Sequence, residues 1–104
     1  MEEAASKDIS EFKTVLIPFI QSLKNEKFIF KLKELLSKAH KLEEIKNSRI
    51  LSQTNQREEG EKKFNKAKRK FLAKCLKNGV KITEDEVFLT SENLAPLYYL
   101  SFNL

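Results

Sequence analysis

Apolar residues recur along the first part of the chain at the spacing of an amphipathic helix. Between residues 9 and 23 they fall three, seven, ten, eleven and fourteen positions after Ile9, which places them on one face of a helix. Pro18 lies inside this stretch, and its ring removes a hydrogen bond to the carbonyl four residues earlier. We therefore expect a first helix that is kinked or broken at Pro18, with a second helix starting near it.

Two longer stretches, residues 26–45 and 57–77, carry apolar stripes of the same kind and predict two further helices. The stripe residues are Phe28, Leu32, Leu35, Ala39 and Leu42 in the earlier stretch and Phe64, Ala67, Phe71 and Cys75 in the later one. The polar residues 52–56 between them predict a linker. Asn78-Gly79 predicts the end of the last helix, because glycine tolerates the left-handed conformation that closes a helix.

The spacing changes after Gly79. Residues 80–82 and 87–89 each alternate, and folding them about the polar residues 83–86 sets Val80 opposite Leu89 and Ile82 opposite Val87 on one face. This agreement of register predicts a β-hairpin. Residues 98–104 alternate as well and predict a third strand; the alternative is a short helix capped by Ser91 and disturbed by Pro96.

Together these patterns predict an α+β protein that is mainly α. It would be a three-helix bundle with its first helix kinked at Pro18, followed by a C-terminal β-hairpin and a possible third strand. We expect one domain over residues 1–104, in which 1–56 hold the first two helices and the linker. Residues 57–79 would form a basic helix, and 80–104 the hairpin and an apolar tail.

The composition narrows the class of protein. The chain has 104 residues, 40% of them hydrophobic, and its single cysteine can form neither an internal disulfide nor a thiolate metal site. Its longest apolar run, residues 15–20, is too short to span a membrane, and its acidic start is unlike a signal peptide. We expect an intracellular protein, cytoplasmic or nuclear, that does not bind membranes.

Charge is distributed unevenly along the chain. Residues 1–61 carry equal numbers of basic and acidic side chains, whereas residues 62–81 carry eight Lys and Arg69 with no acidic residue. Residues 82–104 carry four acidic side chains and no basic one. A helix face that only keeps a protein soluble usually carries both acidic and basic residues, so the basic segment 62–81 points to an anionic partner. The alternative is that its lysines cover apolar surface with the aliphatic part of their side chains.

Five lysines of this segment form one row. Lys63, Lys66, Lys70, Lys74 and Lys77 fall within about 80° of each other on a helix and span about 21 Å along it. Such a row matches several successive phosphates of a nucleic-acid strand. The expected nucleic-acid-binding residues are Lys62, Lys63, Lys66, Arg69, Lys70, Lys74 and Lys77.

The row offers little to read a base sequence. It contains one arginine on its flank, and Phe64 and Phe71 point to the expected core, where they cannot stack on bases. We therefore expect contacts to the phosphate backbone with little sequence specificity, in an accessory subunit of a nucleoprotein assembly.

No catalytic pattern is present. His40 is the sole histidine and has no Asp or Cys at relay spacing, so a structural role is expected; Cys75 falls on an apolar stripe, where a packed thiol is the default. There is no glycine-rich phosphate loop, zinc spacing or calcium loop. We expect a protein that is not an enzyme and has no cofactor, metal site or catalytic residue.

The apolar C-terminus is a second candidate surface. It either folds back to complete the core or docks onto a partner through Leu97, Tyr98, Leu100, Phe102 and Leu104. The second reading makes the chain a protein–protein adaptor or assembly subunit whose basic helix and apolar tail both bind a larger protein assembly. Self-association, with the basic helix against the acidic segment of a second copy, is a third possibility.

Overall fold

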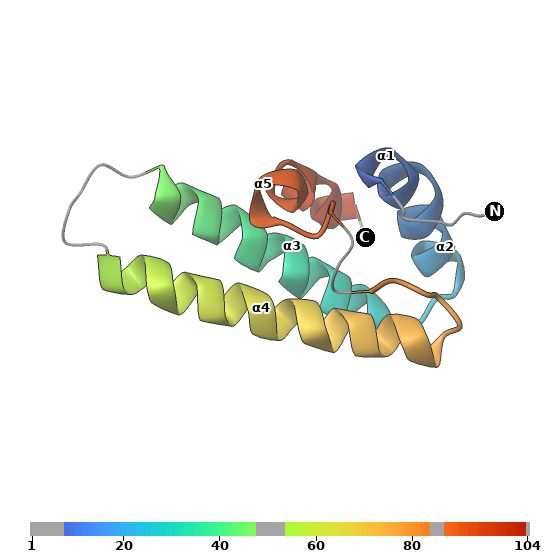
Figure 1. The fold of residues 1–104 in the computed structure, drawn as a ribbon. Helices are drawn as coiled ribbons and strands as arrows, with labels where there is room; N and C mark the ends of the chain where they lie inside the picture. Colours follow the sequence, from blue (N-terminus) through green and yellow to red (C-terminus); the bar gives the residue numbers. More distant parts are fainter. Residues whose placement is uncertain (1–7, 48–53, 84–86, 104) are drawn as a thin grey trace.

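The protein is built from helices that pack around one long helical hairpin (Figure 1). A computed structural model describes residues 8–47, 54–83 and 87–103. Helices α3 (Glu26–Lys46) and α4 (Thr54–Lys77) lie side by side and run in opposite directions. The remaining elements lie on one side of this pair: α1 (Ile9–Glu11), a π-helical turn (Phe12–Leu16), α2 (Ile17–Ser22), α5 (Ser91–Leu94) and a 3₁₀ helix (Ala95–Asn103).

The two long helices begin and end as their capping residues dictate. The Asn25 side chain accepts hydrogen bonds from the amides of Lys27 and Phe28, each 3.1 Å long, and so caps the start of α3. At the end of α4, Gly79 has φ of +78°, and the Val80 amide donates to the Cys75 carbonyl at 2.8 Å. This is a Schellman ending, and the predicted stop at Asn78-Gly79 is confirmed.

The N-terminal helix changes its hydrogen bonding just before the proline. Residues Phe12–Leu16 form a π-helical turn in which the Ile17 amide donates to the Phe12 carbonyl, and α2 then begins at Ile17 with Pro18 in its first turn. Leu16 and Ile17 both have right-handed helical dihedrals, so the chain stays helical from α1 through the π-helical turn into α2. The π-helical turn changes the hydrogen bonding just before the proline, which has no N–H to donate. A π-helical turn, and not a break with a new helix, therefore marks the place of Pro18.

The predicted β-hairpin and third strand are wrong. The described residues contain no strand, and after Gly79 the chain forms an irregular segment followed by α5 and the 3₁₀ helix. Phe88 and Leu89 are both buried although they are neighbours, and Val87 is 75% exposed, which no strand with one buried face would allow. Residues 84–86 of the expected turn at 83–86 lie outside the described residues. The fold class is all-helical over the described part of the chain, and not α+β.

The C-terminal segment follows the alternative that the sequence left open. Thr90, and not Ser91, caps the short helix, because its hydroxyl oxygen accepts from the Asn93 amide at 3.2 Å. Pro96 lies near the start of the 3₁₀ helix, where it breaks no hydrogen-bonded ladder. Leu94 and Leu97 are buried at a spacing of three residues, which is the period of this tighter helix.

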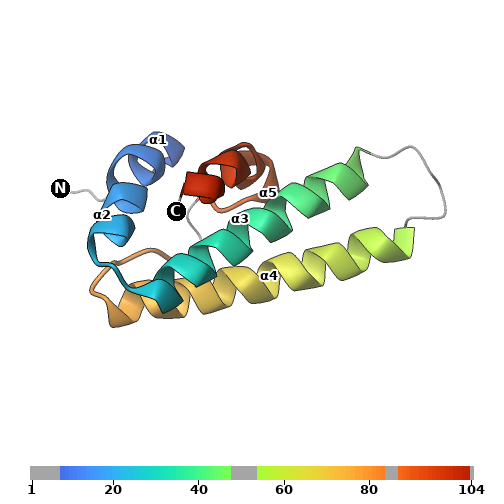
Figure 2. The same ribbon diagram turned by 180° about the vertical axis from the view of Figure 1, so that it is seen from behind.

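One continuous apolar core joins all of these elements. Its centre is a set of phenylalanine rings. The ring centroid of Phe71 lies 6.1 Å from that of Phe12 and 5.8 Å from that of Phe28, and the centroids of Phe12 and Phe88 are 5.2 Å apart. These rings come from the π-helical turn, both long helices and the segment before α5. The core therefore fixes the long hairpin against the short helices and leaves its opposite side open to solvent (Figure 2).

A polar cluster also ties α5 to α3. The Ser91 hydroxyl donates to Glu43 Oε2 at 2.7 Å and accepts from Lys46 Nζ at 3.2 Å, and the Lys46 ammonium lies 3.3 Å from the same carboxylate. Ser91 is buried, so these contacts replace its lost contacts with water. The cluster occupies the side of α3 that the C-terminal segment covers.

Candidate nucleic-acid interface

The predicted lysine row lies on an unbroken helix. α4 extends three residues further toward the N-terminus than expected, because Thr54 to Gln56, predicted as part of the linker, are helical. Four of the row's lysines are exposed, and Lys74 is half-buried at the edge of the core. The flanking residues Lys62 and Arg69 are exposed too.

Carboxylates of the protein neutralise only part of this row. Lys63 Nζ lies 3.5 Å from Glu59 Oε1, one turn earlier on α4. Among the described residues, no carboxylate lies within ion-pair distance of Lys66, Lys70 or Lys77. An exposed pair such as Glu59–Lys63 contributes at most about 1 kcal/mol, so an incoming anion can compete for that lysine as well.

Helix α3 adds basic residues to the same surface. Lys38 lies with Lys63, Lys66 and Lys70 around a shallow groove of about 200 Å³ between the two helices. A second hollow of about 420 Å³ lies on the outer face of α4 and is lined by Lys62, Asn65, Lys66, Arg69 and Lys70. We call these two hollows together the lysine groove. Because both hollows share Lys66 and Lys70, they form one basic surface rather than two sites.

An acidic side chain lies within the lysine groove. Glu34 of α3 lines the inter-helix hollow, and its Oε1 atom is buried without a hydrogen-bond partner. Lysine side chains line the same hollow, and none of them lies within ion-pair distance of Glu34. The lysine groove therefore contains one carboxyl group among its lysines.

Sequence reasoning missed Lys38, Glu34 and Asn65. The first two were hidden because residues 1–61 are neutral as a whole, although Glu34 and Lys38 are one turn apart and share a face of α3. Asn65 is adjacent to the basic residues in the sequence but lies off the lysine row. Its amide gives the groove a neutral hydrogen-bonding group.

The apolar tail is divided between core and surface. Leu97 is buried in the core, Tyr98 and Leu100 are half-buried, and Phe102 is 69% exposed; Leu104 lies outside the described residues. The Tyr98 and Phe102 rings are 5.1 Å apart, and the neighbouring Tyr99 is 63% exposed. The tail thus contributes Leu97 to the core, but as a 3₁₀ helix and not as the expected strand on the hairpin, and it also shows an aromatic surface.

His40 and Cys75 have the structural surroundings that the sequence predicted. The His40 ring is stacked on Tyr98, and its Nε2 atom is 3.6 Å from Glu44. Cys75 is fully buried, and burial raises the pKa of its thiol from 9.0 to about 12. A thiol in this state is neutral at physiological pH and is a poor nucleophile.

The described residues form neither a metal-binding group nor a membrane-spanning helix. No group of three or more His, Cys, Asp or Glu side chains in this part of the chain is arranged to hold a metal ion. No helix there is both long and apolar enough to cross a membrane.

The chain matches no protein-family model, no curated protein and no solved structure.

Proposed function

We propose that this protein binds the phosphate backbone of a nucleic acid through the lysine groove, as a non-enzymatic accessory subunit of a nucleoprotein assembly. The observation that carries the proposal is that Lys66 and Lys70 project from α4 with no described carboxylate within ion-pair distance of either ammonium group. Lysines one turn apart on a helix repel each other, and a polyanion relieves this repulsion while releasing its own counterions.

The groove favours backbone contacts over sequence readout. Ammonium groups bind phosphates as point charges, whereas arginine and amide side chains make the paired contacts that read base edges. Only Arg69 and Asn65 offer such groups among the residues that line the groove. Binding should therefore depend strongly on salt and weakly on base sequence.

Affinity measured across a salt series tests the proposal. With three to five phosphates contacted, the logarithm of the association constant for duplex DNA should fall with the logarithm of salt concentration at a slope of about −3 to −4.5. Fluorescence anisotropy with labelled duplex and single-stranded DNA and RNA measures this slope for each nucleic acid. A slope near zero, or the absence of binding at 50 mM salt, would rule the proposal out.

The exposed aromatic residues of the tail support a second candidate function, that of a protein–protein adaptor. Tyr99 and Phe102 are each more than 60% exposed at a place where their rings also contact each other. Aromatic side chains are enriched at protein interfaces because they bury much area with few rotatable bonds. The double variant Tyr99→Ser/Phe102→Ser removes this surface and spares the buried Leu97, so loss of a copurifying protein with an unchanged salt slope would favour the adaptor.

A further inference from the structure

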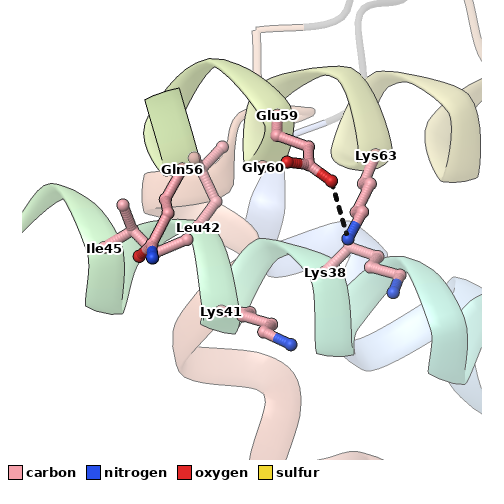
Figure 3. A pocket seen from close by; sticks show the side chains of 8 residues that line it. All are labelled: Lys38, Lys41, Leu42, Ile45, Gln56, Glu59, Gly60 and Lys63. Carbon is pink, nitrogen blue, oxygen red and sulfur yellow. Dashed lines mark ion pairs between the residues drawn. The ribbon is translucent and has the colours of Figure 1, made fainter. Parts of the chain in front are cut away.

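A cleft opens between α3 and α4 beside the lysine groove (Figure 3). Its volume is about 290 Å³, and it lies between the last turns of α3 and the first turns of α4. Lys38 and Lys63 line both the cleft and the inter-helix hollow of the lysine groove. A polymer whose phosphates follow the groove would therefore reach this cleft without a gap.

The apolar part of the cleft lies where a glycine lets the two helices approach closely. A Cβ atom added at Gly60 would lie 3.2 Å from Leu42 Cδ1 and 3.4 Å from Ile45 Cδ1, so these methyl groups pack against the glycine. Glycine is, after proline, the least favourable residue in a helix interior, yet α4 carries one here. Leu42 is buried beneath this contact, and the half-buried Ile45 gives the cleft its apolar floor.

The rim of the cleft is polar and mostly basic. Lys38 and Lys41 come from α3, and Lys63 reaches across from α4, where Glu59 pairs with it at 3.5 Å (Figure 3). Gln56 adds an amide, which can both donate and accept hydrogen bonds. Three ammonium groups against one carboxylate favour an anionic ligand, and the apolar floor favours one with a flat, poorly hydrated body.

We propose that this cleft holds one unpaired nucleotide of the bound nucleic acid, with its base on Ile45 and its phosphate on Lys38 and Lys63. This inference rests on the proposed function and names the part of the nucleic acid that the site selects. The cleft has about the volume of the smallest ligand pockets, which suits one nucleotide and not a base pair. A base inside a duplex is stacked and paired, so only a single-stranded end, loop or flipped base can enter.

Binding to two labelled probes, measured by fluorescence anisotropy across a salt series and compared at equal salt, tests the inference. One probe is a blunt duplex, and the other is a shorter duplex with a four-nucleotide single-stranded overhang and the same number of phosphates. The wild type should bind the overhang probe about fivefold more tightly. Lys41→Glu and Ile45→Ser should each bring this ratio to about one, since Lys41 lines the cleft but neither hollow of the groove.

Lys33→Glu is the matched control. It makes the same charge change as Lys41→Glu on the same helix, at an exposed position that does not line the cleft, and it should keep the fivefold ratio. The inference is overturned if the wild type binds both probes equally, or if either cleft variant keeps its preference for the overhang probe. In that case the proposed function still stands, provided that both probes bind with a salt dependence. Absence of salt-dependent binding to both probes overturns the proposed function and this inference with it.

Discussion

The imidazole ring of His40 on α3 is stacked on the phenol ring of Tyr98, with ring centroids 4.4 Å apart and ring planes 12° apart. The same imidazole meets the edge of Tyr99 at 5.8 Å. The imidazole ring thereby joins the C-terminal 3₁₀ helix to the long hairpin.

His40→Ala should loosen the C-terminal segment. The loss of one stacked pair is expected to lower the free energy of unfolding by about 0.5–1.5 kcal/mol, measured by urea denaturation. Glu44→Gln is the control, because Glu44 is 67% exposed and the loss of its pair with His40 should change stability by less than about 0.5 kcal/mol. Equal effects of the two variants would contradict a role for the ring stack.

Ser91→Ala should destabilise the contact between α5 and α3. The variant leaves Glu43 without the 2.7 Å hydrogen bond that the serine hydroxyl donates, in a partly buried place. A cost of about 1–2 kcal/mol in the free energy of unfolding is expected. Hydrogen exchange should show faster exchange at the Leu94 amide, which is bonded to the Thr90 carbonyl, and unchanged exchange there would contradict the account.

Two substitutions with opposite expected effects on stability test the residues that have positive φ. Gly79→Ala should lower the free energy of unfolding by about 1–2 kcal/mol, because φ at this residue is +78° and no atom lies close enough for the new methyl group to contact. Lys24, between α2 and α3, has φ of +51°, so Lys24→Gly should raise stability or leave it unchanged. Thermal unfolding of both variants beside the wild type gives the comparison.

Cys75 should resist thiol reagents until the protein unfolds, since burial raises the pKa of its thiol to about 12. The unfolded chain loses this proton near pH 9.0 while the folded chain keeps it, so the thiol lowers stability as pH rises above 9. Between pH 9 and 11 the free energy of unfolding of the wild type should fall more steeply than that of Cys75→Ala, by up to about 1.4 kcal/mol per pH unit. Parallel pH profiles would show that the thiol is not held neutral by the fold.

The long helices could be predicted from the sequence because each carries an apolar stripe at helical spacing, and α4 also has a clear end signal. Phe64, Ala67 and Phe71 occupy the buried face of α4, and Gly79 ends that helix as its type predicts. The C-terminal elements could not be predicted in the same way. Alternation over five or six residues, such as Tyr98 to Phe102, fits a strand and also a short helix whose one side meets the core.

The lysine row of α4 was predicted, but its partner residues on α3 were not. Net charge counted along the chain averages over the faces of a helix. On α3, Glu43 lies on the side of α5, whereas Glu34 and Lys38 both lie on the groove side. The antiparallel pairing of α3 with α4 decides which residues meet across the groove. That pairing depends on the tertiary fold, which the spacing of residues in one helix does not encode.

Charge reversal at the centre of the lysine groove is the most direct test of the account. The double variant Lys66→Glu/Lys70→Glu is compared with Lys13→Glu/Lys33→Glu, which makes the same charge change at exposed positions away from the groove. The account predicts that the groove variant loses at least about tenfold in affinity for duplex DNA and flattens the salt slope by about 2, while the control variant keeps most of both. Equal losses in the two variants, or none in either, would contradict it.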